Sequence, residues 1–427
     1  MIKIHQNSSV KDLIALTERP KLDSADLQKV IDDIYSGIVT SGDSYLIEMT
    51  KKFDNADLNS VRVEAQFILD AYNSTDEGLK EAIIQAKDNI TKFHTAQLPK
   101  DIEVETMNGV FCYQKARAIE RIGIYIPGGT APLFSTILML ALPAKIAGVK
   151  EIILCSPPTY EGGIHPTILA TAKICGIDHV FQVGGAQAVA AMAVGTDAIP
   201  KVSKIFGPGN QYVTAAKENA QKYGVAIDMP AGPSEVLVYA DETCMPDYVA
   251  ADLLSQAEHG VDSQVVAVVS TIEIADAINK ALAIQLEELP RKEIAKKALE
   301  NSHIIIEPDV TTAFQYINIY GPEHFIIASD RADELADLTI NAGSVFLGNL
   351  CPEAVGDYAS GTNHTLPTYG WAKSYSGVNI DTFMRKITFQ KLNQQGMEHL
   401  GPIVVTMAEA EQLQAHANAV KIRLKDL

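Results

Sequence analysis

Between residues 120 and 347, short runs of β-branched and apolar residues alternate with segments of helical periodicity. This alternation predicts βαβ units, in which helices cover both faces of a parallel sheet. The first series is predicted to have strands at Ile122–Ile126, Glu151–Cys155, His179–Val183, Lys204–Phe206, Ala226–Asp228 and Glu235–Ala240, with helices over Ser135–Ala147, Pro166–Cys175, Ala186–Val194 and Gln211–Lys222. The sequence therefore predicts an α/β fold.

A second alternation begins after Asp241. Its predicted helices are Tyr248–Glu258, Ile272–Glu287, Lys292–Asn301, Thr311–Tyr316 and Ala332–Ile340, and its predicted strands are Ser263–Ser270, His303–Glu307, Phe325–Ala328 and Ser344–Leu347. Outside the two α/β series, helices are expected over Ser24–Thr40, Leu79–Leu98 and Ala408–Leu424, and β-like runs at Lys386–Gln390 and Ile403–Thr406. We expect two α/β units of similar size with smaller elements at both ends of the chain.

The charge balance argues against nucleic acid and anionic membranes as partners. The chain has 35 Lys and Arg against 53 Asp and Glu, a formal net charge of −18, whereas non-specific binding to a phosphate backbone comes from clustered cations. The longest apolar run, near Ile137–Val149, is interrupted by Pro143 and Lys145 and is too short to span a bilayer. The N-terminus lacks a signal pattern and the five cysteines form no CxxC, so we expect a cytoplasmic protein with free thiols.

Two glycine-rich turns lie between a predicted strand and a predicted helix. They are Tyr125-Ile126-Pro127-Gly128-Gly129 and Gly207-Pro208-Gly209-Asn210. Backbone amides at such a turn can bind a phosphate at the N-terminus of the helix. Glycine is also needed there for steric reasons alone, and the GxGxxG and phosphate-loop patterns are absent, so nucleotide binding stays one of two interpretations.

Several side chains are candidates for catalysis or metal binding. Gln256 and His259 lie three residues apart near a helix end, where they could share a metal, although a hydrogen-bonded structural histidine is the simpler alternative. Glu323 and His324 precede an apolar strand and could form an acid/base pair. Asp357 lies in an aromatic-rich loop over Cys351–Gly377, together with His364, and suits zinc or manganese. Glu411 and His416 lie in the predicted C-terminal helix.

Seven longer stretches resemble the histidinol dehydrogenase family closely. They are Tyr125–Ser135 (YIPGGTAPLFS), Gly207–Asn210 (GPGN), Asp228–Asp241 (DMPAGPSEVLVYAD), Asp252–Gly260 (DLLSQAEHG), Tyr320–His324 (YGPEH), Ala342–Gly348 (AGSVFLG) and Gly356–Gly370 (GDYASGTNHTLPTYG). The resemblance extends from about residue 25 to the C-terminus. It implies a Zn²⁺-dependent enzyme that oxidises L-histidinol to L-histidine through the aldehyde with two NAD⁺ in turn.

The resemblance also implies roles for individual residues. Glu323 and His324 would be the catalytic pair, and Gln256, His259, Asp357 and His416 the zinc ligands. The substrate contacts would be Ser234, Gln256, His259, His324, Glu353, Asp357, His364, Glu411 and His416, and the NAD⁺ contacts Tyr125, Gln187 and Asn210. The family is homodimeric, so Glu411 and His416 would come from the partner subunit.

These patterns together predict two incomplete Rossmann-like parallel-sheet domains with small N- and C-terminal helical elements. The expected divisions are an N-terminal arm over 1–24, a first α/β domain formed by 25–120 and 237–380, a second, NAD⁺-binding domain over 121–236, and a C-terminal domain over 381–427 that reaches the partner subunit. Two other functions stay open at this point. One is a zinc hydrolase that uses no nucleotide, and the other is a small-ligand binding protein made of two α/β lobes.

Overall fold

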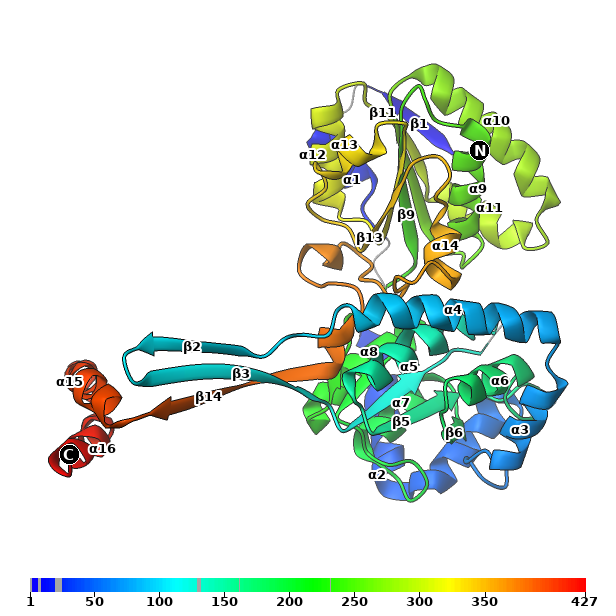
Figure 1. Ribbon diagram of the computed structural model, residues 1–427. Helices are drawn as coiled ribbons and strands as arrows, with labels where there is room; N and C mark the ends of the chain where they lie inside the picture. Colours follow the sequence, from blue (N-terminus) through cyan, green and yellow to red (C-terminus); the bar gives the residue numbers. More distant parts are fainter. Residues whose placement is uncertain (1, 7–8, 20–24, 129–131, 161, 231) are drawn as a thin grey trace.

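The computed structural model describes residues 2–6, 9–19, 25–128, 132–160, 162–230 and 232–427. Its chain forms two α/β bodies, one above the other, and a long arm that projects sideways from them (Figure 1). Both bodies are built on parallel sheets. The α/β fold predicted from the alternating pattern is therefore confirmed.

A five-stranded parallel sheet organises one body, with strand order β6-β5-β4-β7-β8. The strands are β4 (Arg121–Tyr125), β5 (Glu151–Ser156), β6 (His179–Gln182), β7 (Lys204–Phe206) and β8 (Ala226–Ile227), and the helices between them are α5 (Ser135–Ala147), α6 (Pro166–Ile174), α7 (Gly185–Val194) and α8 (Gln211–Ala220). These bounds lie close to the predicted ones. The near-continuous apolar runs of β4 and β5 are buried on both sides, as a covered parallel sheet requires.

A six-stranded parallel sheet organises the other body, with strand order β1-β11-β10-β9-β12-β13. The strands are β1 (Lys3–Gln6), β9 (Glu235–Ala240), β10 (Gln264–Val269), β11 (His303–Ile306), β12 (His324–Ala328) and β13 (Ser344–Leu347). The helices are α1 (Val10–Leu16), α9 (Pro246–Ala257), α10 (Ile272–Glu288), α11 (Lys292–Glu300), α12 (Val310–Tyr320), α13 (Ala332–Ala336) and α14 (Glu353–Tyr358). The N-terminal segment is thus an edge strand of this sheet.

The N-terminal helices pack on the five-stranded body. They are α2 (Ala25–Asp54), α3 (Ala65–Ser74) and α4 (Glu77–Thr95). Ile31, Tyr35 and Ile38 of α2 share an apolar core with α7, while Ile83 and Ile90 of α4 share one with α5. These cores group residues 25–95 with residues 121–236, instead of with 237–380 as the sequence had suggested. Periodicity defines the apolar face of a helix, but it does not say which sheet that face will cover.

The arm is a three-stranded antiparallel sheet with strand order β14-β3-β2 and two helices at its tip (Figure 1). Its elements are β2 (Ile102–Met107), β3 (Val110–Ala118), β14 (Met384–Leu392), α15 (Gln394–Ala410) and α16 (Gln414–Lys425). The strand expected at Lys386–Gln390 is confirmed within β14. The β-like run expected at Ile403–Thr406 is wrong, because these residues lie inside α15 and that helix packs on α16, with Gly401 against Leu424.

None of the helices in the described part of the chain combines the length and apolar character needed to cross a bilayer. The longest helical element, α2, carries Asp and Lys side chains along its length and changes direction at Gly42. The apolar helix α5 has 13 residues, contains Pro143 and lies buried in the five-stranded body.

A partly buried histidine pair joins β1 to its neighbour β11. His5 Nε2 lies 3.1 Å from His303 Nδ1. Burial, together with the charges of His5 and Lys3, lowers the pKa of His303 to about 4. Because the unfolded chain binds this proton near pH 6.5, stability should be lost as the pH falls from 6.5 towards 4. We expect this group to contribute a loss of about 2 kcal/mol between pH 7.5 and pH 5, measured by urea unfolding as the difference between the parent and His303→Gln.

The His303→Gln variant should lose most of this pH dependence, because the group that takes up the proton on unfolding is gone. His399→Gln is the control, since His399 is exposed on the arm. Equal pH dependence in the parent and in His303→Gln would contradict the assignment.

Candidate active site

A pocket of about 540 Å³ lies between the two bodies. One wall is the carboxyl edge of the five-stranded sheet, where Gly207 and Asn210 follow β7. The opposite wall is the amino edge of the six-stranded sheet, where Ser234 precedes β9 and Glu323 precedes β12. Three strands that are distant in sequence therefore end or begin at one cavity.

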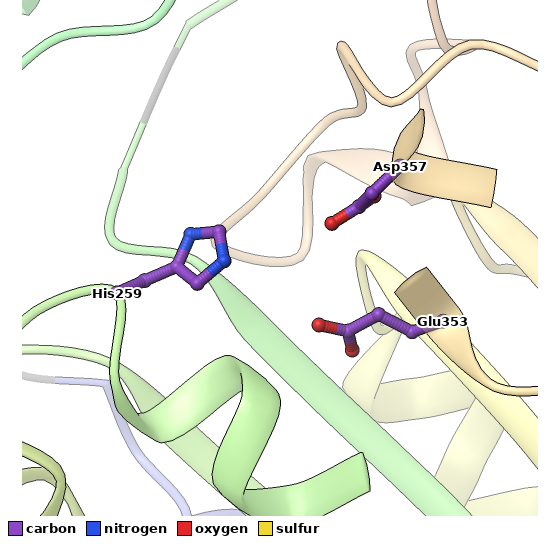
Figure 2. A group of neighbouring side chains, drawn as sticks. All are labelled: His259, Glu353 and Asp357. Carbon is purple, nitrogen blue, oxygen red and sulfur yellow. The ribbon is translucent and has the colours of Figure 1, made fainter. Parts of the chain in front are cut away.

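Three candidate ligand side chains converge beside this pocket. His259 follows α9, whereas Glu353 and Asp357 lie one helical turn apart on α14. Their donor atoms all lie within 4.8 Å of one another, and the imidazole points towards both carboxylates (Figure 2). Donors bound to one Zn²⁺ at about 2 Å stand some 3–4 Å apart, so a small contraction of this cluster would close around the ion.

The electrostatics of this cluster also favour a bound cation. Burial raises the pKa of Glu353 to about 8, and the charges of Asp357 and Glu323 act in the same direction. Burial alone would raise the pKa of Asp357 too, but the hydrogen bond from His324 and the nearby histidines hold it below its ordinary value. A divalent cation would stabilise both carboxylates in their charged forms. The donor set of imidazole and carboxylate oxygen fits zinc.

Gln256 is completely buried in the last turn of α9 and lies at the back of the cluster. In the amide orientation that satisfies both groups, its Nε2 donates to Glu353 Oε1 at 2.8 Å. The family resemblance implies only a substrate contact for Glu353. In the structure its carboxylate belongs to the cluster with His259 and Asp357 and is hydrogen-bonded to Gln256.

Glu323 and His324 lie close together, and both are buried. His324 Nδ1 lies 3.7 Å from Glu323 Oε2, and His324 Nε2 lies 3.2 Å from Asp357 Oδ1. Burial alone would lower the pKa of His324, but the carboxylates of Glu323, Glu353 and Asp357 raise it well above its ordinary value. A cation that neutralised these carboxylates would lower the pKa of His324 again and leave the imidazole able to accept a proton.

His364 connects the cluster to the other body. Its Nδ1–H donates to the backbone oxygen of Asp357 at 2.7 Å, so its Nε2 accepts from the Thr136 hydroxyl at 3.0 Å. Burial lowers the pKa of His364, and the ring is neutral with a defined tautomer. Because Thr136 belongs to α5, this ring holds the two bodies together at the wall of the pocket.

The expected NAD⁺ contacts lie at the carboxyl edge of the five-stranded sheet. Tyr125 ends β4, and its hydroxyl accepts from the Gly185 amide at 3.0 Å. Gln187 is buried in the first turn of α7. Asn210 is exposed, lines the pocket and caps α8 through its Oδ1. The three residues share one sheet edge, while Gly129 of the first glycine-rich turn lies outside the described residues.

The Gly207–Asn210 turn is held by an ion pair that the sequence did not single out. Lys217 and Asp228 are both buried, and Lys217 Nζ lies 2.5 Å from Asp228 Oδ1. Lys217 donates to the Gly207 oxygen at 2.9 Å, and the Gly207 amide donates to Asp228 Oδ2 at 2.9 Å. Gly207 has a φ of 124°, and a side chain there would collide with the Tyr125 oxygen. In the sequence, the signal for this pair was Lys217, a charged residue among the positions of α8 that are buried.

Glu411 and His416 do not reach the site within one chain. Glu411 follows α15 and His416 belongs to α16, both at the tip of the arm and away from α9 and α14 (Figure 1). Every other predicted metal or catalytic residue lies at the junction of the two bodies. A second chain would have to supply the two arm residues.

Comparison with known proteins agrees with this geometry. The family model described as histidinol dehydrogenase matches residues 17–424. The chain belongs to the histidinol dehydrogenase family. A histidinol dehydrogenase of Bacteroides thetaiotaomicron is 51% identical, and the match covers 100% of both chains. One from Vibrio parahaemolyticus is also 51% identical, with 99% of this chain and 98% of that protein covered.

The family likeness extends to three dimensions. The crystal structure of histidinol dehydrogenase from Elizabethkingia anophelis superposes with a TM-score of 0.97 at 50% identity, covering 100% of this chain and 98% of that one. The family resemblance inferred from the sequence motifs is therefore confirmed. The arm and both α/β bodies belong to the shared fold, since the whole chain is covered.

The buried ion pair at the Gly207 turn gives a stability prediction. Lys217→Met should destabilise the fold by about 3–5 kcal/mol, because Asp228 would stay buried without its counter-charge. Lys222→Met is a matched control, since Lys222 forms a solvent-exposed pair with Asp32 at 3.7 Å and should cost less than about 1 kcal/mol. Urea unfolding of both variants measures the difference, and equal losses would contradict the role of the pair.

Proposed function

We propose that this protein oxidises L-histidinol to L-histidine in two successive hydride transfers to NAD⁺, with zinc bound at the junction of its two bodies. The observation that supports this most is the convergence at one pocket. The His259, Glu353 and Asp357 cluster and the Glu323–His324 pair meet the Gly207–Asn210 turn there. Membership of the histidinol dehydrogenase family supports the same reaction.

Zinc would be held by Gln256, His259 and Asp357, with His416 of the partner subunit as the fourth ligand. When bound, the ion would orient the substrate amine and imidazole and would neutralise part of the carboxylate charge beside His324. Glu353, bonded to Gln256, lies close enough to contact the substrate or the ion. Ser234 and His364 line the wall against which the substrate would lie.

His324 and Glu323 divide the proton transfers between them. In the first oxidation the His324 imidazole would take the hydroxyl proton of the alcohol. In the second oxidation Glu323 would take a proton from the water that attacks the aldehyde. The cofactor accepts the hydrides, while the chain's own groups hold and move the protons.

The active site requires a homodimer, because Glu411 and His416 must come from the partner subunit's arm. The surface beside the cluster supports such docking. Val345 and Leu347 of the edge strand β13 and Val355 and Tyr358 of α14 are exposed apolar side chains, and α14 is the helix that carries Asp357. Apolar residues at the tip of the arm, such as Met407, are exposed as well.

An assay of NADH formation distinguishes the proposed dehydrogenase from a zinc hydrolase and from a small-ligand binding protein. Zinc-loaded protein given L-histidinol and NAD⁺ should form two NADH for each histidine, measured by absorbance and amino-acid analysis. A hydrolase would form no NADH, and a binding protein would retain histidinol without turnover.

We place the protein in the cytoplasm, where its five free thiols would stay reduced.

Replacing Glu323 by Gln should separate the two oxidation steps. The variant keeps the shape of the side chain but cannot take a proton from water, so aldehyde oxidation should fall about 100-fold or more while alcohol oxidation falls less. Single-turnover rates with histidinol and with histidinaldehyde measure the two steps. Glu242→Gln, on an exposed carboxylate beyond the far end of β9, is the control. An unchanged aldehyde rate in Glu323→Gln would contradict the role of Glu323.

Mixing inactive variants should reveal a shared site. His259→Ala and His416→Ala should each lose zinc and activity. Exchange of their subunits in equal amounts should restore about a quarter of the parental activity, because about half of the dimers are then mixed and one of the two sites in each mixed dimer is intact. A mixture of His259→Ala with Asp357→Ala is the control and should stay inactive, because both defects lie on the same side of the interface. Failure of the first mixture to recover, with mixed dimers verified by native mass spectrometry, would contradict the shared site.

A further inference from the structure

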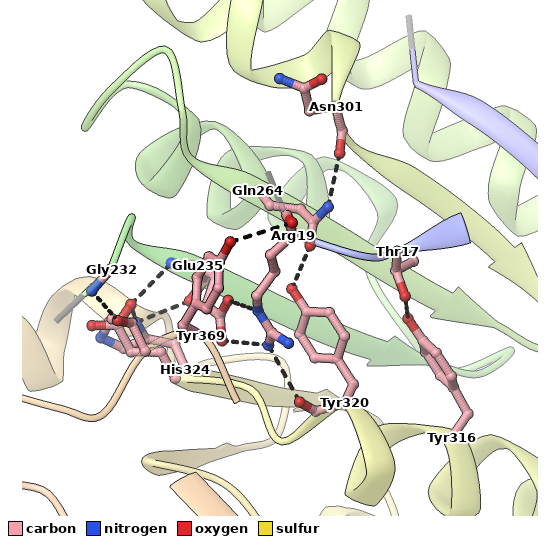
Figure 3. Close-up of polar contacts among 12 residues, drawn as sticks. Thr17, Arg19, Gly232, Glu235, Gln264, Asn301, Tyr316, Tyr320, His324 and Tyr369 are labelled. Carbon is pink, nitrogen blue, oxygen red and sulfur yellow. Dashed lines mark hydrogen bonds and ion pairs between the residues drawn. The ribbon is translucent and has the colours of Figure 1, made fainter. Parts of the chain in front are cut away.

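Arg19, the last described residue of the N-terminal segment, lies against the amino edge of the six-stranded sheet (Figure 3). Its Nε lies 2.5 Å from Glu235 Oε2, and its Nη2 lies 2.7 Å from Glu235 Oε1. The side chains of both residues are largely buried, with 13% and 2% of their surface exposed. This bidentate geometry matches the planar fork of guanidinium, and a lysine ammonium could not reproduce it.

The main chain of Glu235 contacts both members of the catalytic pair. Its N–H donates to Glu323 Oε2 at 2.9 Å, and its carbonyl oxygen accepts from His324 Nδ1 at 3.3 Å. Two adjacent peptide groups therefore orient the carboxylate and the imidazole. The contact leaves the Nε2 side of the His324 ring facing Asp357 and the cluster.

Arg19 also holds the segment that carries the pair. Its Nη2 donates to the Tyr320 backbone oxygen at 3.3 Å, and its Cζ lies 3.9 Å from the centre of the Tyr320 ring. Tyr320 begins the turn that leads through Gly321 and Pro322 to Glu323. Its hydroxyl in turn donates to Gln264 Oε1 at 2.8 Å. The guanidinium thus joins the start of β9 to the turn before β12.

We propose that Arg19 is a positioning residue for the Glu323–His324 pair, acting through the Glu235 peptide groups. The proposal rests on the proposed function, in which that pair moves the protons. Loss of the guanidinium would leave the Glu235 carboxylate buried without its partner, and β9 could relieve this only by shifting its first residues. Such a shift moves the N–H that orients Glu323. Displacement of a proton-transfer group lowers the rate of the chemical step more than it weakens substrate binding.

Kinetics of Arg19→Gln and Arg19→Lys test the proposal in the full-length, zinc-loaded protein. We expect kcat for histidinaldehyde oxidation to fall about 10- to 100-fold in Arg19→Gln, with KM changed less than about threefold, and to recover partly in Arg19→Lys. The matched controls are Arg331→Gln and Arg331→Lys. Arg331 lies 3.8 Å from Asp241 at the opposite end of β9 and should leave kcat unchanged.

Zinc content and the urea midpoint of each variant are measured alongside the rates. A kcat within twofold of the parent in Arg19→Gln, at full zinc occupancy, would overturn the proposal, as would a rise in KM at constant kcat. If Arg19→Gln does not fold, Arg19→Lys decides by itself. We expect it to lose kcat severalfold at the parental midpoint, and an unchanged kcat would overturn the positioning role.

A spectroscopic measurement separates this proposal from the proposed function. In protein labelled with ¹⁵N-histidine, the Nδ1 proton of His324 gives an imidazole resonance. This resonance is assigned because it is absent from the spectrum of His324→Gln. We expect Arg19→Gln to shift or broaden this resonance and Arg331→Gln to leave it unchanged. If the parent forms no NADH, the proposed function fails, whereas an unperturbed resonance in Arg19→Gln means that the positioning role fails.

Discussion

Three buried carboxylates and the partly exposed Asp357, at the amino edge of the six-stranded sheet, place the strongest constraint on this structure. Each requires a compensating group, because an isolated buried charge is very costly. Glu235 is paired with Arg19, Asp357 with His324, and Glu323 with a backbone amide. Glu353 is hydrogen-bonded to Gln256, and among the described residues the charge of His324 acts to lower its pKa, while burial raises it to about 8. A divalent cation in the cluster would balance this arrangement.

The position of this charged edge follows from how the two sheets meet. Parallel α/β sheets usually bind ligands at the carboxyl ends of their strands, and the five-stranded sheet follows that rule with the Gly207–Asn210 turn. The six-stranded sheet faces the same pocket with its amino edge. The two edges face each other across the pocket. One edge carries glycine turns, which suit a phosphate, and the other carries carboxylates and imidazoles, which suit a metal. His364 connects the two walls through Thr136.

The arm separates part of the chain from both bodies. It carries β2, β3 and β14 away from both bodies and ends in α15 and α16 (Figure 1). An antiparallel sheet of three strands with exposed apolar residues such as Ile102, Val104 and Ile387 gains little stability alone. Packing against a partner subunit would bury those residues and would bring His416 to the cluster of the other chain.

The sequence alone determined the α/β class and most element bounds, and its motifs indicated the candidate site residues, because hydrophobic periodicity and motif chemistry are local properties. The helix α5 and the turn at Gly207–Asn210 are examples of such local information. Tertiary structure decided which sheet the helices of residues 25–95 cover, the helical state of residues 403–406, and the bonding of Glu353 to Gln256. It also decided the pairing of Arg19 with Glu235, residues 216 positions apart. Such contacts depend on how sheet edges and apolar faces meet in space, and no local pattern encodes that meeting.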